Sequence, residues 1–291
     1  MPATSANLGP GFDVAGLALT LYNTFVFELQ ENGLEITGTP PQFANEDNMT
    51  YQAFAQAAQR CGLEFGGVKI DFSGDVPYTR GLGSSSTCIV AGIVAAFAFK
   101  NHNPDRQAVL ELATEIEGHP DNVAPAIFGG MTVSVMDNEK VKTLNLPIKN
   151  DYRFVALIPP FTLSTEASRK VLPETLTRKD AISNVAHLAL LVASLLNGDD
   201  AGLKQGFHDS LHQPYRGKLI KGYQEIMDIL AQDDKVLGCY LSGAGPTLMA
   251  LISEKDTLGV VRIKEELGEL LEDWQVVKLE LDTRGYTVDF E

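Results

Sequence analysis

The stretch that organises this chain reads Asp75-Val76-Pro77-Tyr78-Thr79-Arg80-Gly81-Leu82-Gly83-Ser84-Ser85-Ser86-Thr87. Its glycines allow positive φ and a close backbone approach, and its serines offer hydroxyls and amides where a helix is predicted to begin. The segment that follows, 88–99, is apolar on nearly all sides, which predicts a buried helix. Because the N-terminus of a helix carries free amides and the positive end of its dipole, this stretch is predicted to bind phosphate.

A glycine- and serine-rich run can also be a plain flexible loop, and a Gly-x-Gly pair alone does not separate the two. The context favours phosphate binding, because Val68, Ile70 and Phe72 predict a strand before the turn and a helix follows it. No Lys precedes the serines, which excludes a Walker A loop, and the spacing is not that of a dinucleotide fingerprint. The phosphate charge must then be met by amides, hydroxyls, a metal ion and residues elsewhere in the chain.

The composition fits a protein of two ordinary domains that share a cleft. The chain has 291 residues, of which 44% are hydrophobic, and a formal net charge of −15. This acidity argues against nucleic acid or an anionic membrane surface as a partner, since both require basic patches. An acidic protein that binds a polyphosphate is also expected to need a divalent cation.

The three cysteines, Cys61, Cys88 and Cys239, are far apart and form no CxxC pair. They are predicted to be reduced residues of a cytoplasmic protein. No secretory signal pattern opens the chain, and the longest apolar run is shorter than the roughly 18 residues that a membrane span requires. We therefore expect a soluble protein that is not exported.

Hydrophobic periodicity predicts an α+β protein. Residues 14–29 alternate as in a strand, and Asn32-Gly33 is a hairpin signal that precedes a returning strand at Leu34 and Ile36. Further strands are predicted over 131–136, 154–158, 236–241, 248–252 and 275–281, and helices over 48–61, 105–116, 180–196, 219–231 and 260–271. A turn is predicted at Asn138, and the polar segment 144–151 is the predicted domain boundary.

Three stretches, in chain order, resemble the signatures of the small-molecule kinase superfamily that includes galactokinase, mevalonate kinase and homoserine kinase. They are Pro2–Asp13, Pro77–Ser86 and Leu241–Thr247. Within that superfamily, Asn7–Asp13 and Glu117–Pro125 are most similar to the homoserine kinase branch. The resemblance extends over the whole chain.

The resemblance implies an α+β fold with the active site in a cleft between two domains. These are a ribosomal-protein-S5-like nucleotide-binding domain over 1–151 and a ferredoxin-like domain over 152–291. The implied activity is ATP-dependent phosphorylation of the side-chain hydroxyl of L-homoserine to O-phospho-L-homoserine, a step of threonine biosynthesis. ATP and Mg²⁺ are the implied cofactors, and the resemblance allows a homodimer.

By resemblance, ATP binds the phosphate loop, whose residues are Pro77, Tyr78, Thr79, Arg80, Gly81, Leu82, Gly83, Ser84, Ser85, Ser86 and Thr87. Asn48 lies near the adenine in the family, although capping of the helix that begins there explains it equally well. Ser84 and Glu117 are the implied magnesium ligands, and a hydroxyl with a carboxylate suits Mg²⁺, which keeps much of its water. For Glu117 the alternative is a solvated charge at a helix C-terminus, where the dipole disfavours it.

The implied acceptor site contains Asn122, which is expected to hydrogen-bond the reacting hydroxyl, and His119. In mevalonate kinase-like relatives an Asp acts as the base, whereas homoserine kinases are thought to rely on positioning and electrostatics. Asp121 therefore stays open as a candidate base, so the catalytic candidates are Asn122, Asp121, Glu117 and Ser84. A metal site at His119 and Asp121 is a weaker alternative, because two ligands and an amide hold a metal poorly.

An amino-acid substrate presents an ammonium and a carboxylate. Asp13, with Asn7 six residues before it, is expected to receive the ammonium. By resemblance, Arg169 and Arg216 bind the carboxylate through their planar guanidinium groups, with an ordinary salt bridge as the alternative for each. Gly243, in a second glycine-rich turn, is expected to let the backbone approach the substrate, although a hairpin would also explain that glycine.

Two other functions stay open at this stage. The first is a kinase of another small alcohol, such as a sugar or mevalonate, which also carries a carboxylate. The second is a non-catalytic nucleotide-binding protein on the same scaffold. The presence of Ser84, Glu117 and Asn122 weighs against the second, because a decayed enzyme would be free to lose them.

Overall fold

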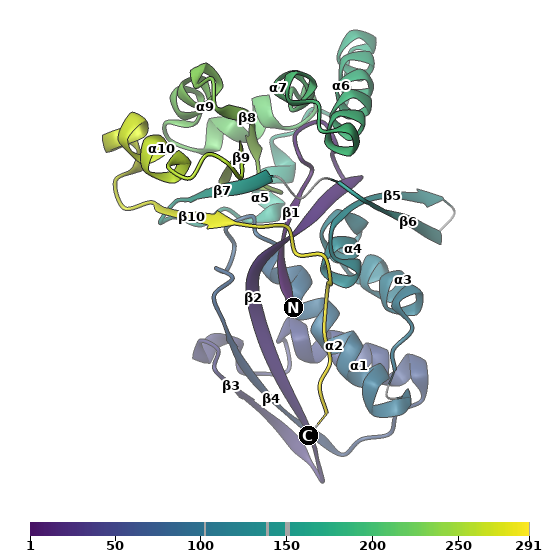
Figure 1. Cartoon of the computed structure of the whole chain (residues 1–291). Helices are drawn as coiled ribbons and strands as arrows, with labels where there is room; N and C mark the ends of the chain where they lie inside the picture. Colours follow the sequence, from purple (N-terminus) through teal and green to yellow (C-terminus); the bar gives the residue numbers. More distant parts are fainter. Residues whose placement is uncertain (102, 138–139, 149–151, 291) are drawn as a thin grey trace.

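The computed structural model describes residues 1–101, 103–137, 140–148 and 152–290. These residues form two α+β halves that meet along a shared interior (Figure 1). The upper half in Figure 1 contains the later part of the chain, and the lower half contains most of the first 148 residues. The predicted two-part α+β architecture is therefore confirmed.

The sheet of the N-terminal half is built around the long strand β2 (Ala15–Gln30). One end of β2 pairs with β1 (Pro2–Ala6) and β5 (Met131–Asp137), and the other end pairs with β4 (Gly67–Gly74). The outer strands are β3 (Gly33–Thr37) beside β4 and β6 (Lys140–Leu146) beside β5. β1 is buried over its whole length, which places it between the two halves.

The hairpin predicted at Asn32-Gly33 is wrong in its pairing. The chain turns there, but β3 pairs in parallel with β4, with Leu34 opposite Val68. β4 separates β3 from β2, because Ile70 of β4 lies opposite Phe27 of β2. A turn signal reports only local reversal, so it does not reveal that a later strand inserts between the two arms. The turn predicted at Asn138 lies outside the described residues, as does the end of the predicted boundary segment 144–151.

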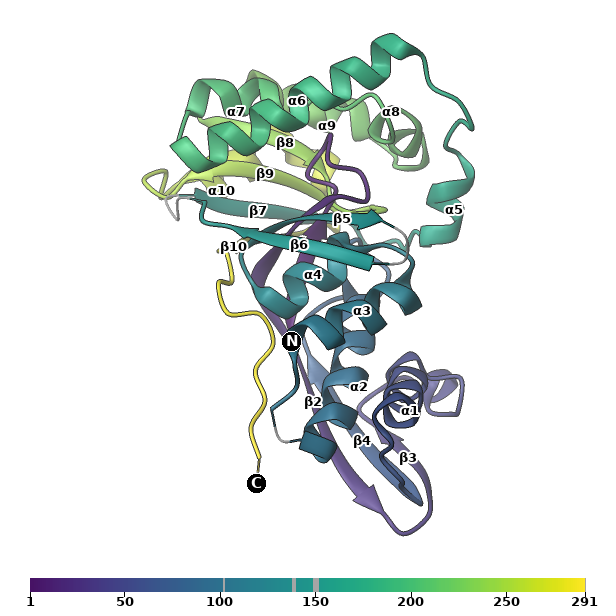
Figure 2. The ribbon, with the colours of Figure 1, turned by 90° about the vertical axis from the view of Figure 1, so that its right-hand side faces the viewer.

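Four helices cover one face of this sheet: α1 (Met49–Cys61), α2 (Ser84–Asn101), α3 (Arg106–Glu117) and α4 (Pro120–Phe128) (Figure 2). α2 is the central one, and its apolar side chains are buried on most sides, as its composition predicts. α4 was not predicted from the sequence, because Pro120 and Pro125 are residues that normally argue against a helix. Pro120 occupies the first turn, where its missing N–H has no consequence.

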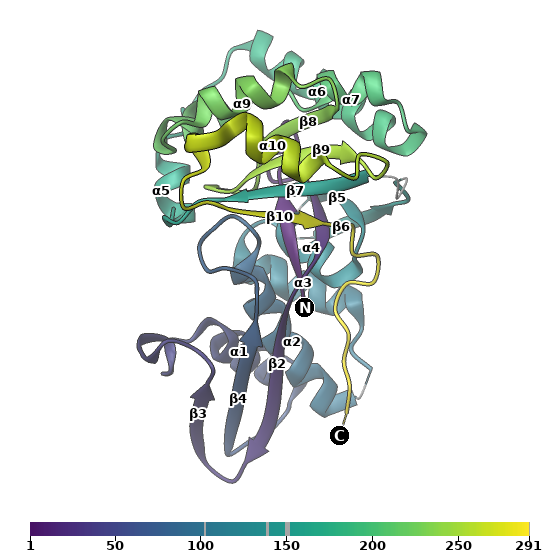
Figure 3. The same ribbon diagram turned by 60° about the vertical axis from the view of Figure 1, so that its left-hand side comes forward.

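The sheet of the C-terminal half has the order β10-β7-β9-β8, with all pairs antiparallel. Its strands are β7 (Tyr152–Ile158), β8 (Val236–Leu241), β9 (Leu248–Ser253) and β10 (Gln275–Leu279). Alternate residues of β7 face opposite sides. Val155 and Leu157 pack against α9 (Tyr223–Gln232) and α10 (Gly259–Leu267), whereas Phe154 and Ala156 pack into the interior shared with β1 and β2. Figure 3 shows α9 and α10 on one side of this sheet and β1 and β2 on the other.

The remaining helices of this half lie around the upper sheet. α6 (Arg178–Asn197) and α7 (Asp200–Gly206) contribute to the shared interior, and the short helices α5 (Thr165–Lys170) and α8 (Gln213–Arg216) lie toward the cleft. Three 3₁₀ turns complete the described part: η1 (Pro41–Phe43), η2 (Gly217–Leu219) and η3 (Gly268–Leu271).

After β10 the chain crosses back and runs along the N-terminal half (Figure 1). The Asp282 amide donates to Ala18 O at 2.9 Å, and the Thr20 amide donates to Glu280 O at 3.0 Å. The Tyr286 ring is buried in the N-terminal core, with the Arg106 guanidinium 4.7 Å from its centre. The predicted domain boundary between residues 151 and 152 therefore does not apply to the last residues of the chain, which pack against the N-terminal half.

Two helices of the described part are long and apolar enough to cross a membrane: α2 and α6. The expectation that no segment reaches that length is therefore corrected. About two thirds of α2 (67%) is buried inside the molecule, which explains its apolar composition, whereas 22% of the apolar window of α6 is buried.

The buried ring of Tyr286 leads to a stability prediction. Tyr286→Ala is expected to lower the free energy of unfolding by about 3 kcal/mol, because it removes a packed aromatic ring and leaves a cavity. Chemical denaturation measures the change. Thr287→Ala, at an exposed neighbour in the same segment, is the control and is expected to stay within about 0.5 kcal/mol. Equal values for both variants would show that the returning segment contributes no packing.

Candidate active site

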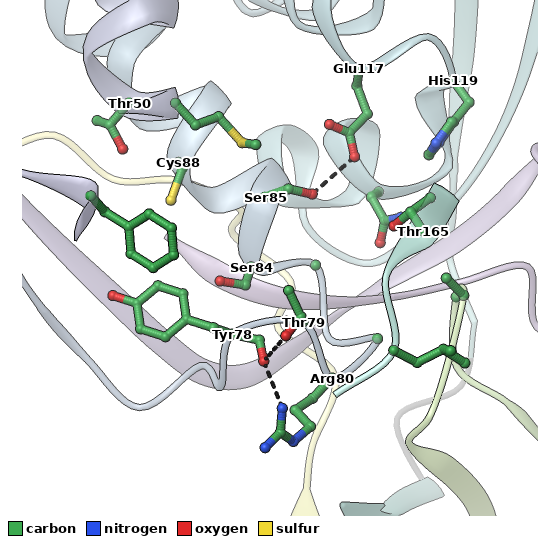
Figure 4. Close-up of a pocket in the computed structure, with 18 of the residues that line it drawn as sticks. Thr50, Tyr78, Thr79, Arg80, Ser84, Ser85, Cys88, Glu117, His119 and Thr165 are labelled. Carbon is green, nitrogen blue, oxygen red and sulfur yellow. Dashed lines mark hydrogen bonds between the residues drawn. The ribbon is translucent and has the colours of Figure 1, made fainter. Parts of the chain in front are cut away.

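A cavity of about 350 Å³ lies where the two halves meet, and both halves line it. One end is aromatic and apolar, the middle is formed by the phosphate loop, and the other end carries charged side chains (Figure 4). The loop residues that line it are Tyr78, Thr79, Arg80, Gly81, Gly83, Ser84 and Ser85. The N-terminus of α2 therefore opens into the cavity, in the position predicted for anion binding.

The phosphate loop is held tightly from behind. Gly81 and Gly83 have positive φ values, 77° and 68°. A side chain at Gly83 would collide with Thr4, and one at Gly81 would collide with the Ser242 carbonyl. The Ser242 hydroxyl donates to Gly81 O at 2.5 Å, so the second glycine-rich turn supports the first. Both glycines are required by close contact with neighbouring strands and turns, which a flexible loop would not need.

Several residues predicted to bind the nucleotide are not part of the cavity lining. Pro77, Leu82, Ser86 and Thr87 do not line it. Leu82 is buried in the core, and the Thr87 hydroxyl donates to Ser84 O at 2.8 Å. These residues support the loop, since side chains in a helical turn cannot all point toward the same ligand.

Arg80 lines the cavity, but its guanidinium is already engaged. Its nitrogens donate to the carbonyls of Pro159 at 3.0 Å, Pro160 at 2.8 Å and Tyr78 at 3.2 Å. Pro159 and Pro160 follow β7, so Arg80 ties the phosphate loop to the C-terminal half. In this structure its side chain joins the two halves instead of facing a phosphate.

Glu117 lies at the end of α3 and faces the phosphate loop (Figure 4). Its Oε1 accepts hydrogen bonds from Ser85 at 3.1 Å and Ser86 at 3.3 Å. Burial raises the pKa of Glu117, and no Lys or Arg of the described residues forms an ion pair with it. A buried carboxylate of this kind fits the oxygen ligands that a hard divalent cation prefers. Ser84 lines the same cavity, but the hydroxyls that hydrogen-bond to Glu117 are those of Ser85 and Ser86.

His119, Asp121 and Asn122 lie at the start of α4. His119 Nδ1 is 2.6 Å from Asp121 Oδ1, and Asp121 is only 1% exposed. Burial disfavours the charge of His119, but the hydrogen bond to Asp121 and the nearby carboxylates outweigh it and raise the pKa of His119. The Asn122 Oδ1 accepts a hydrogen bond from Thr4 at 2.8 Å. All three residues line the cavity.

Asp13 is engaged by Arg169 in this structure. The two form a two-pronged ion pair, with N···O distances of 2.7 and 3.1 Å. Ligand-type atoms of Asp13, His119 and Asp121 lie within 4.8 Å of one another. Since Asp13 already pairs with Arg169 and Asp121 with His119, this cluster is an ion-pair network and a poor metal site.

Arg216 is buried, at 1% exposure, and lines the charged end of the cavity. Its nitrogens donate to Ser168 O at 3.2 Å and Gly243 O at 3.1 Å. No carboxylate of the described residues forms an ion pair with it, and Nη2 has no hydrogen-bond partner among them. Burial and the neighbouring charge of Arg169 lower the pKa of Arg216 to about 10. The cavity therefore contains a buried cation without an anion.

Asn7 and Asn48, two further predicted site residues, hold neighbouring parts of the structure in place. Asn7 uses both ends of its amide, because Nδ2 donates to Gly243 O at 2.9 Å and Oδ1 accepts from the Asp13 amide at 3.1 Å. It therefore fixes Asp13 relative to the second glycine-rich turn. Asn48 caps α1, accepting from the amides of Thr50 and Tyr51. Asn48 also lines the cavity, so its role as a helix cap does not prevent it from facing a ligand there.

Sequence reasoning missed the aromatic end of the cavity. Its lining includes Phe25, Phe43 and Phe72, with Tyr78 5.8 Å from Phe72 and 6.3 Å from Phe43 between ring centres. Phe25 and Phe72 lie on paired strands, and their alternation looks like that of core residues. Thr165 of α5 was also missed, since nothing in the sequence near it indicates that a short helix faces the phosphate loop (Figure 4).

The two halves and their cavity are those of a two-domain small-molecule kinase. Residues 48–130 match the family described as "GHMP kinases N terminal domain", and residues 191–273 match "GHMP kinases C terminal". Together these matches cover more than half of the chain and include the phosphate loop, Glu117 and the second glycine-rich turn. The chain belongs to the GHMP kinase family.

Several relatives that the chain matches over nearly its full length carry the particular name homoserine kinase. Homoserine kinase of Clostridium beijerinckii is 46% identical over 289 residues, which cover 99% of this chain and 97% of the relative. That of Clostridium botulinum strain Alaska E43 is 42% identical, covering 98% and 96%. The crystal structure of homoserine kinase from Cytophaga hutchinsonii superposes with a TM-score of 0.85 at 25% identity, covering 98% and 94%. Mevalonate kinase of L. major, at 15% identity and a TM-score of 0.74, shares the fold.

The position of Cys88 on the cavity wall leads to a test of nucleotide binding. Burial raises the pKa of Cys88, and it raises that of Cys239 to about 12, so both thiols are protonated at pH 8. Labelling of either by a thiol reagent is expected to be slow and to accelerate about tenfold per pH unit from pH 8 to 9, as the thiolate fraction grows.

ATP is expected to slow the labelling of Cys88 and to leave that of Cys239, which does not line the cavity, unchanged. Peptide mapping by mass spectrometry resolves the two sites. Equal protection of both cysteines would indicate global stiffening of the protein instead of occupancy of the cavity.

Proposed function

We propose that this protein is an ATP-dependent kinase that transfers the γ-phosphoryl group to the side-chain hydroxyl of L-homoserine, giving O-phospho-L-homoserine. The observation that supports this proposal most strongly is the charged end of the cavity. There the buried Arg216, which has no carboxylate partner among the described residues, lies beside the Asp13–Arg169 ion pair. The phosphate loop lines the same cavity. The full-length similarity to proteins named homoserine kinase supports the same substrate.

A zwitterionic substrate matches these charges. Its carboxylate would neutralise Arg216 and share Arg169, and its ammonium would take Asp13 from Arg169. One ion pair within the protein would thus be exchanged for contacts to both ends of the amino acid. Mevalonate offers a carboxylate but no cation for Asp13, so this end of the cavity favours an amino acid.

The aromatic end of the cavity suits the adenine of ATP, with Phe43, Phe72 and Tyr78 as flat apolar contacts. The triphosphate would then lie on the N-terminus of α2, where amides and the helix dipole favour negative charge. Ser84 and Glu117 are the proposed ligands of Mg²⁺, which when bound neutralises the phosphate charge.

Catalysis in this proposal rests on placing the acceptor oxygen in line with the γ-phosphorus. Asn122 orients the acceptor hydroxyl. Asp121 is buried and bonded to His119, and this arrangement supports a role in holding His119 in place more than direct removal of a proton. All three cysteines are free thiols, which accords with a reducing, cytoplasmic environment. The proposed reaction is a step of threonine biosynthesis.

An ADP-release assay tests the substrate. With Mg-ATP the protein is expected to turn over L-homoserine and to show less than about 1% of that rate with mevalonate, galactose or L-serine. Asp121→Asn is expected to retain at least about a tenth of kcat, since no carboxylate base is required. Turnover confined to mevalonate or galactose would overturn the substrate proposal, and a complete loss in Asp121→Asn with an intact fold would restore Asp121 as the base.

Arg216→Lys tests the carboxylate site. The KM for homoserine is expected to rise by about 10- to 100-fold, because an ammonium cannot replace the planar, two-pronged contact of a guanidinium. The KM for ATP is expected to change by less than about threefold. Steady-state kinetics with each substrate varied gives both values, and equal increases would mean that Arg216 supports the whole cleft instead of the acceptor.

A further inference from the structure

Strand β1 carries two buried hydroxyls that the proposed reaction leaves unused. Thr4 and Ser5 are both 0% exposed, and every residue of β1 is buried. Because side chains alternate along a strand, the two hydroxyls point to opposite faces. Valine and alanine would fill such positions without the cost of burying polar groups, so each hydroxyl needs partners that explain it.

Thr4 lies between the phosphate loop and the acceptor site. Its hydroxyl donates to Asn122 Oδ1 at 2.8 Å, its amide donates to Leu82 O at 3.1 Å, and its side chain fills the space that Gly83 leaves open. One residue therefore contacts both the loop that is proposed to hold the phosphates and the amide that is proposed to orient the acceptor.

The Thr4 contact decides which way the Asn122 amide faces. Asn122 Oδ1 is the one hydrogen-bond acceptor for the Thr4 hydroxyl among the described residues. Turning the amide over would leave the Thr4 proton without an acceptor in a buried site, which is unfavourable. Thus Oδ1 points toward β1, and Nδ2, which has no partner among the described residues, is the amide atom left for the cavity.

We propose that Thr4 is a positioning residue for phosphoryl transfer and acts by holding the Asn122 amide with its N–H groups toward the acceptor oxygen; this rests on the proposed function. The amide then donates to one lone pair of the acceptor hydroxyl and leaves another for attack. In the transfer, the acceptor oxygen forms a bond to the γ-phosphorus as the bond from that phosphorus to the ADP oxygen breaks. An amide that donates cannot accept the hydroxyl proton, which passes to a phosphoryl oxygen or to water.

Ser5 provides a matched comparison. Its hydroxyl lies 2.8 Å from Ser242 Oγ and 3.1 Å from the Tyr240 hydroxyl, and it makes no hydrogen bond to Asn122. It is as buried as Thr4, belongs to the same strand and supports the same phosphate loop through Ser242 and Gly81. A loss that comes only from disturbing β1 would therefore be similar for Ser5 and Thr4.

The test is a double-mutant cycle on kcat with saturating ATP and homoserine. Thr4→Val keeps the shape of the side chain and removes the hydroxyl, and it is expected to lower kcat about tenfold. Thr4→Ser, which keeps the hydroxyl, is expected to stay within about threefold. Asn122→Ala is expected to lower kcat about 100-fold, as removal of an aligned donor does elsewhere. Adding Thr4→Val to Asn122→Ala is expected to cause no further loss beyond about twofold.

Adding Ser5→Ala to Asn122→Ala is expected to multiply the two separate losses, because Ser5 acts independently of Asn122. If Thr4→Val and Asn122→Ala also multiply, or if Thr4→Ser is as impaired as Thr4→Val, the proposal is wrong. Thr4→Ala, which adds no bulk, serves for the cycle if Thr4→Val does not fold. Absence of homoserine turnover in the unsubstituted protein would refute the proposed function, whereas multiplied losses in an active protein would refute only the role of Thr4.

Discussion

The N-terminus of a single buried helix is the constraint on which the rest of this structure depends. α2 is apolar on most sides and lies at the centre of the N-terminal core, so it cannot shift without opening that core. Its first turn must nevertheless face the cavity, with its amides free. The chain meets both demands with Gly81 and Gly83, whose positive φ values let the loop turn sharply against Thr4 and Ser242.

The two halves are joined by polar contacts at the cavity and by apolar packing behind it. β1 and β2 share one apolar interior with β7, α6 and α7. Closer to the cavity, Ser242 bonds to Gly81 and Arg80 bonds to the carbonyls of Pro159 and Pro160. Each of these contacts ties the phosphate loop to the C-terminal half, so the geometry of the loop depends on both halves. A site assembled in this way favours precise placement of two substrates, which is the main requirement of phosphoryl transfer.

Charge is arranged unevenly in this acidic protein. The molecule carries a net charge of −15, yet the cavity contains Arg169 and Arg216 close together, and of these two only Arg169 has a carboxylate partner among the residues that the structure describes. Burial, together with repulsion from the neighbouring guanidinium of Arg169, lowers the pKa of Arg216 to about 10. A fold tolerates such a buried, unmatched charge where a ligand supplies the missing anion, and this accords with a substrate that carries a carboxylate.

The sequence by itself determined what local chemistry can encode: the phosphate loop, the buried helix after it, the second glycine-rich turn and the cluster from Glu117 to Asn122. These features depend on residue type and short spacing, and the structure places them around one cavity. Only the tertiary structure decided that β4 separates β2 from β3 and that Phe25 and Phe72 line the cavity. It also decided that the Arg80 guanidinium hydrogen-bonds to backbone carbonyls. The reason is physical, since these outcomes depend on which distant segments pack together, and alternation along a strand is the same whether a side chain meets a core or a ligand.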